Sequence, residues 1–173
     1  MEEDIKFEEV ENKPIKKIII ILIALLLIIL ILSFLLTNPE IRINIKGLIE
    51  SSEINNEVVE SGNITVIIPG NIYDELLQIK QENADLEFKV CLFADYDSGN
   101  YSVTSIYRPI IYTQEYDKVV SAPCPEDTLI DLHSHPYLHC SFSEQDVKSF
   151  EQSKNKNSLM MVMCEDNRFN IYN

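Results

Sequence analysis

The sequence predicts one α+β or α/β-sandwich domain that follows a single transmembrane helix. An uninterrupted apolar run lies near the N-terminus. After residue 63, short β-branched and aromatic runs typical of strands alternate with segments typical of helices. Such a mixture packs helices against a sheet around one core. With 173 residues, the chain has room for one domain of ordinary size plus accessory segments.

The apolar run extends from Ile18 to Leu36 and contains one polar residue, Ser33. At about 1.5 Å per residue it covers roughly 28 Å, close to the ~30 Å hydrocarbon core of a bilayer. A cleaved signal peptide is the alternative. The run is longer than a usual signal-peptide core, however, and no small-residue cleavage site follows it. We therefore expect an uncleaved anchor through which the chain contacts the lipid bilayer.

The positive-inside rule favours a cytoplasmic N-terminus and a domain outside the cytoplasm. Three lysines precede the anchor closely, whereas Arg42 and Lys46 follow it at a distance. We expect four parts: a polar cytoplasmic tail (1–17), the transmembrane helix (18–37), an acidic and Asn-rich stalk (38–62) and the folded domain (63–173).

The domain should open with a strand over 64–68, ended by Pro69 and Gly70. A helix should follow, capped by Asn71, with Asp74 and Glu75 in its first turn and its end at 83–85. The remaining expected elements are strands at 88–93 and 101–107 around a turn at 97–100, strands at 119–120, 128–132, 159–163 and 169–172, and a helix from Ser143.

Charge disfavours nucleic acid as a partner. The chain carries a formal charge of −14, and its part after residue 37 has 22 acidic against 10 basic side chains. Such a surface repels phosphate backbones.

The four cysteines lack CxxC spacing, so they suggest neither a disulfide scaffold nor a four-cysteine zinc site. Cys91 and Cys164 lie in apolar strand-like runs, where a cysteine is typically a small core residue. If the domain lies outside the cytoplasm, one or two disulfides become possible, with pairing left open.

A candidate metal site centres on His133 and His135, which share one face of an extended strand because they are two residues apart. Asp146 can add an oxygen ligand from the start of the following helix. Three protein ligands and one open position are typical of catalytic zinc. Zinc lowers the pKa of a bound water to about 7 and polarises a carbonyl.

The pattern H-x-H-x7-S-x2-D, with Pro136 after the second histidine and Cys140 within the spacer, resembles the JAMM (MPN-plus) zinc metalloproteases. This resemblance covers residues 63–173. It implies a central mixed sheet flanked by helices and one Zn²⁺ per domain, held by His133, His135 and Asp146. It also implies that Ser143 stabilises the oxyanion of the tetrahedral intermediate.

The family also has a glutamate at the start of a strand upstream, in the pattern E-x-x-G-x-L-x-G. Glu87 occupies that place, 46 residues before His133, and Leu92 matches. Val90 and Ala94 stand where the pattern has glycines. Glu82 is the nearest competitor, but it falls within the expected helix. The resemblance thus implies Glu87 as the general base.

Several of these residues have simpler explanations. Ser143 with Asp146 is also an ordinary helix-capping pattern, and both roles are compatible. His139 fits a surface loop better than a spare ligand. Cys140 fits packing beneath the site better than a structural metal site or a nucleophile beside His139.

Together these features predict a membrane-anchored metallo-isopeptidase or peptidase that hydrolyses an amide bond with a zinc-bound water. The family resemblance implies a protein substrate that ends in a ubiquitin-like or sulfur-carrier tail, bound as an added strand. The alternative is a non-catalytic binding or scaffold module of the same fold at the membrane. A relative associated with DNA repair, which shares His-x-His-Pro, is disfavoured by the acidic charge and the anchor.

Overall fold

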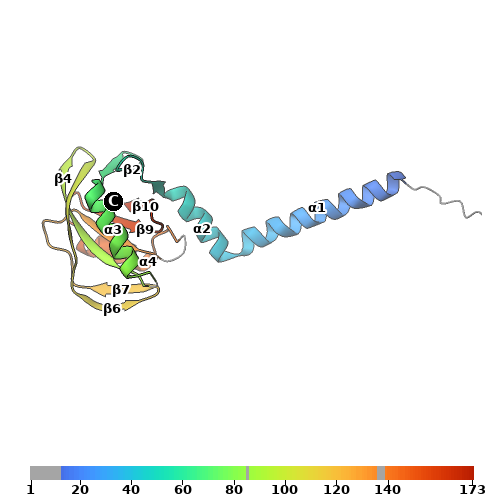
Figure 1. The fold of residues 1–173 in the computed structure, drawn as a ribbon. Helices are drawn as coiled ribbons and strands as arrows, with labels where there is room; N and C mark the ends of the chain where they lie inside the picture. Colours follow the sequence, from blue (N-terminus) through green and yellow to red (C-terminus); the bar gives the residue numbers. More distant parts are fainter. Residues whose placement is uncertain (1–12, 85, 136–138) are drawn as a thin grey trace, which may run out of the picture. The chain divides into compact units, whose positions relative to one another are not determined.

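The computed structural model describes residues 13–84, 86–135 and 139–173, shown in Figure 1. Most of the expected tail and Pro136 of the motif lie outside the described residues. The chain divides into two compact units, Met1–Arg42 and Ile43–Asn173, which are described separately.

The first unit contains helix α1, Lys13–Thr37. From Pro14 to Thr37 the helix is long and apolar enough to cross a membrane, judged by its length and composition. None of its most apolar window is buried within the described structure. Its exposed isoleucine and leucine side chains therefore suit a lipid environment better than water.

The segment expected as a stalk is largely folded. It contains helix α2 (Pro39–Glu50) and strands β1 (Ser52–Glu53) and β2 (Val58–Ser61), and the second compact unit begins at Ile43 rather than near Asn63. Pairing with distant strands overrides the polar composition of the segment. Strand β2 pairs with strand β3 (Ile64–Ile67), and Val59 is fully buried.

The second unit is built on a mixed sheet of the order β1-β10-β9-β8-β4-β5-β3-β2. Strands β8 and β9, and likewise β3 and β5, are parallel, whereas the other neighbours are antiparallel. The further strands of the sheet are β4 (Lys89–Asp97), β5 (Asn100–Tyr107), β8 (Ile130–Ser134), β9 (Leu159–Met163) and β10 (Arg168–Tyr172). A separate hairpin joins β6 (Ile111–Glu115), which the sequence did not predict, to β7 (Lys118–Ser121).

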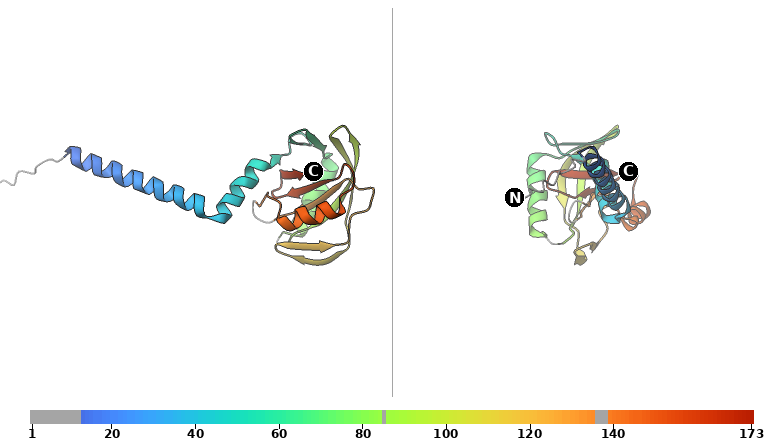
Figure 2. Two further views of the ribbon diagram at one scale, coloured as in Figure 1. Left: turned by 180° about the vertical axis from the view of Figure 1, so that it is seen from behind. Right: turned by 90° about the vertical axis from the view of Figure 1, so that its right-hand side faces the viewer.

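Two helices cover opposite faces of this sheet, which confirms the α+β class (Figure 2). Helix α3 (Gly70–Glu82) buries Ile72, Leu76 and Ile79 against a core that includes Leu132 of β8. Helix α4 (Glu144–Ser153) lies on the other face and buries Phe150. Side chains alternate along a strand, so Ile130, Leu132 and Ser134 face one way while Asp131 and His133 face the other.

Helix α3 begins differently from the expectation. Pro69, not Asn71, is the N-cap, and Asp74 and Glu75 lie beyond the first turn. The φ of Pro69, −57°, suits the entry into a helix. Its carbonyl oxygen accepts hydrogen bonds from the amides of Ile72 and Tyr73 at 2.9 Å, and the Glu57 carboxylate accepts one from the Gly70 amide at 2.6 Å, so the first turn is fixed without a side-chain cap from the N-cap residue.

All four cysteines form disulfides, Cys91–Cys124 and Cys140–Cys164. The expectation that Cys91 and Cys164 are small core residues is confirmed, since both are buried. Both are bonded to partners distant in the chain, however, and are not free thiols. Loop-closure entropy over sequence separations of 33 and 24 corresponds to about 3–4 kcal/mol of stabilisation per bond.

Candidate metal centre

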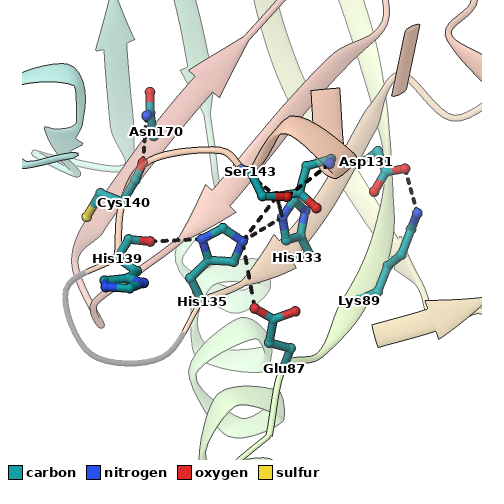
Figure 3. Close-up of polar contacts among 10 residues, drawn as sticks. Glu87, Lys89, Asp131, His133, His135, His139, Cys140, Ser143 and Asn170 are labelled. Carbon is teal, nitrogen blue, oxygen red and sulfur yellow. Dashed lines mark hydrogen bonds and ion pairs between the residues drawn. The ribbon is translucent and has the colours of Figure 1, made fainter. Parts of the chain in front are cut away.

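His133, His135 and Asp146 bring three potential metal-ligand atoms together (Figure 3). The Nε2 atoms of the two histidines are 3.2 Å apart. Asp146 Oδ2 lies 3.6 Å from His133 Nε2 and 3.4 Å from His135 Nε2. A tetrahedral zinc ion about 2.0–2.1 Å from each ligand would hold its ligand atoms about 3.3–3.4 Å apart. The cluster could therefore hold a metal ion of this size.

The ring of His135 is oriented by a backbone contact. Its Nδ1 lies 3.0 Å from the carbonyl oxygen of His139. A carbonyl can only accept a hydrogen bond, so Nδ1 carries the proton and Nε2 keeps its lone pair. That lone pair is the group a metal requires, and this arrangement is the usual support for a histidine ligand. His139 contributes through its backbone, and its ring is not part of the cluster.

Asp146 is presented by the first turn of helix α4. Ser143 is the N-cap, and its Oγ accepts a hydrogen bond from the Asp146 amide at 3.1 Å. In return, Asp146 Oδ2 accepts one from the Ser143 amide at 2.8 Å. This reciprocal capping box fixes the carboxylate beside the histidines. Because Ser143 Oγ acts as an acceptor in this bond, its own hydrogen remains available for donation.

The charge state of Asp146 suits a ligand. Partial burial of the carboxyl group opposes its ionisation. Contacts with His133 and His135, and the hydrogen bond from Ser143, outweigh that effect and hold the pKa of Asp146 well below its usual range. The group is therefore a carboxylate at neutral pH.

Glu87 lies directly before strand β4 and faces the cluster. Its Oε1 is 3.7 Å from His135 Nε2, and the residue is only 7% exposed. Burial raises the pKa of Glu87 to about 7, although the nearby charge of His135 acts in the opposite direction. Such a group can both accept and return a proton near neutral pH.

The competitor Glu82 is engaged elsewhere. It lies on helix α3, where its carboxylate accepts hydrogen bonds from Arg108 at 3.1 Å and from Gln78 at 2.9 Å. Of the two candidate bases, only Glu87 lies beside the histidines.

Sequence reasoning missed Ser134, the residue between the two histidines. Its Oγ accepts a hydrogen bond from the Phe88 amide at 2.9 Å, and its own amide donates to the Phe88 carbonyl at 2.9 Å. These bonds fasten the start of β4, and with it Glu87, to the His-x-His strand. Strand alternation was the available signal, since it turns Ser134 away from the histidines.

Strand β6 holds Glu87 from the other side. The Glu87 amide donates to the Glu115 carbonyl at 3.1 Å, and Gln114 Nε2 donates to the Glu87 carbonyl at 2.9 Å. The β6–β7 hairpin was only partly predicted, so this support could not be foreseen.

A cleft of about 440 Å³ extends from the cluster between strand β7 and helix α4. On its floor, the ammonium group of Lys89 forms an ion pair with the carboxylate of Asp131 at 2.7 Å. The residues that line the cleft also include Glu87, Val119, Ser121, His133, Ser143, Asp146 and Phe150. The cleft is partly open to solvent beside His133.

Cys140 is excluded as a metal ligand and as a nucleophile, because its sulfur is bonded to Cys164. The residue is fully buried, and its carbonyl oxygen accepts a hydrogen bond from Asn170 Nδ2 at 2.6 Å. The disulfide and this bond instead secure the segment that carries His139.

The chain matches none of the known protein families and none of the curated proteins with which it was compared. The interpretation of the site therefore depends on its own geometry and on the sequence motif.

Proposed function

We propose that the chain is a membrane-anchored zinc hydrolase of amide bonds, an isopeptidase or peptidase of the JAMM type. The observation that carries this proposal is the convergence of His133, His135 and Asp146, with Glu87 beside them. Two imidazole nitrogens and one carboxylate oxygen form a donor set suited to zinc. When bound there, zinc would lower the pKa of a water molecule to about 7 and polarise the scissile carbonyl.

Glu87 is the proposed general base. Its carboxylate accepts the proton that the attacking water loses and returns it to the departing amine. The elevated pKa of about 7 supports this shuttle, because both protonation states are populated near neutral pH. Ser143 is proposed to donate its hydroxyl hydrogen to the oxyanion, since its capping bond with the Asp146 amide leaves that hydrogen free.

The substrate is proposed to enter the cleft as an extended segment along strand β7. Within the described sheets, β7 pairs only with β6, so its second edge can accept an added strand. The small side chain of Ser121 lines that side of the cleft, and helix α4 forms the opposite wall. This arrangement suits a flexible C-terminal tail of a ubiquitin-like or sulfur-carrier protein.

The two disulfides support a location of this domain outside the cytoplasm. Disulfides persist in oxidising compartments and are rare among cytoplasmic proteins. The lysines that precede helix α1 favour the same orientation. In that topology the substrate is an exported or envelope protein. Protease added to sealed vesicles that display the outer membrane face would digest the domain, whereas protection would contradict this topology.

Zinc content and hydrolysis test the enzymatic proposal. Full-length chain purified in detergent should contain about one zinc per chain by elemental analysis. It should also cleave a fluorogenic isopeptide or peptide substrate, with activity lost to a chelator and restored by zinc. His133→Ala should lose both zinc and activity, whereas a matched exposed change, Lys156→Ala, should lose neither.

A non-catalytic scaffold is the second candidate. Under that function, neither the isopeptide nor the peptide substrate would be cleaved, even by protein that had been loaded with zinc. Absence of zinc after metal loading would contradict the proposed hydrolase and favour the scaffold.

A further inference from the structure

The part of helix α2 that belongs to the second compact unit, from Ile43 to Glu50, has one side that packs against the rest of that unit. Gly47 is its one buried residue. A Cβ atom at this position would lie 3.0 Å from both the Cβ and the backbone nitrogen of Cys140. Such contacts are tighter than those of nearly all side chains, so glycine suits this close approach, and the contact fixes which side of the helix faces the rest of the domain.

A second side of the helix is apolar and exposed. Ile45, Leu48 and Ile49 recur at i, i+3 and i+4, the spacing of one helical stripe. Ile45 is 48% exposed, Leu48 43% and Ile49 78%. We call these three residues the α2 stripe. Their exposure means that the described part of the chain leaves the stripe largely uncovered.

The position of the stripe in the chain identifies what covers it. Helix α2 starts at Pro39, two residues after helix α1 ends at Thr37. Its twelve residues span about 18 Å, so the stripe cannot be far from where the chain leaves a bilayer. Arg42 and Lys46 are exposed beside the stripe. Basic residues next to an apolar helix face are typical of helices that lie in a membrane interface.

We propose that the α2 stripe is inserted in the interfacial region of the lipid bilayer, with Arg42 and Lys46 beside lipid phosphates. This interaction is independent of the proposed hydrolysis. Because Gly47 packs closely against Cys140 of the domain, insertion of the stripe would hold the domain near the membrane surface. The domain would then reach only substrates close to that surface.

The chain contains no tryptophan, so a single introduced indole reports on one position. Full-length Ile49→Trp and Ile45→Trp are reconstituted in nanodiscs that contain zwitterionic and anionic lipids, with or without brominated acyl chains. Asp74→Trp, at an exposed position of helix α3, is the matched helical control. The readouts are the emission maximum and the quenching by brominated lipid.

We expect blue-shifted emission and severalfold stronger bromolipid quenching for the two stripe variants than for Asp74→Trp. Omission of the anionic lipid should weaken the quenching, because the negative surface charge that attracts Arg42 and Lys46 is then lost. Quenching equal to the control in both stripe variants would overturn the proposal. A blue shift without quenching would also overturn it, since protein, such as a second copy of the chain, would then cover the stripe.

Discussion

Ser134 provides a quantitative test of how the site is assembled. Its Oγ accepts a hydrogen bond from the Phe88 amide at 2.9 Å, and both residues are buried. Ser134→Ala removes the acceptor and leaves a buried amide without that partner. A buried unsatisfied donor costs about 1–3 kcal/mol, so the free energy of unfolding of the domain should fall by that amount.

The same change should affect catalysis more than metal binding. Glu87 precedes Phe88, so loosening the start of strand β4 should displace the base and lower kcat. The metal ligands His133 and His135 keep their own contacts. Zinc content should therefore stay near the wild-type level.

Urea titration followed by far-UV circular dichroism would measure the stability, and elemental analysis the zinc. Ser105→Ala, at an exposed position of β5, is the control and should change the unfolding free energy by less than about 0.5 kcal/mol. A Ser134→Ala protein as stable and as active as the control would refute this account of the site.

Three further predictions follow from the other supports of the site. Gly47→Val should lower zinc affinity roughly 10–100-fold by calorimetric titration, because it displaces the segment whose carbonyl orients His135; unchanged affinity would contradict that role. The value of kcat/KM should rise with pH through about 7, because Glu87 acts as a base only when deprotonated; a flat pH profile would exclude it. Cys91→Ala combined with Cys124→Ala should lower the free energy of unfolding by about 4 kcal/mol, whereas a loss below about 1 kcal/mol would contradict the loop-closure estimate.

The parts of the site that local spacing determines were predictable. His133 lies in strand β8 and His135 directly follows its last residue, Ser134, so the two-residue spacing of an extended chain puts both histidines on one face. Asp146 follows Ser143 within one helical turn, and the capping box that joins them is likewise a local pattern. Most strands of the sheet were also predicted, since their β-branched and aromatic runs have lengths typical of buried strands.

The parts that depend on distant contacts were not predictable. Strand β1 lies in an acidic, Asn-rich segment, and only its pairing with β10, near the other end of the domain, makes it a strand. The disulfide partner of Cys91 lies in a connection after β7, where no local pattern marks it. The carbonyl of Glu87 is held by Gln114 of strand β6, a contact between elements 27 residues apart. Each case involves tertiary contacts that override local propensity or leave no local trace.

Turnover by a zinc-loaded base variant tests the central claim most directly. Full-length Glu87→Gln keeps the size of the side chain but removes its ability to accept a proton. The account predicts that it retains about one zinc per chain yet loses activity by a factor of roughly 10²–10⁴. Glu82→Gln, whose carboxylate interacts with Arg108 instead, should keep the wild-type rate. Full activity of Glu87→Gln at full zinc occupancy would contradict the proposed hydrolytic mechanism.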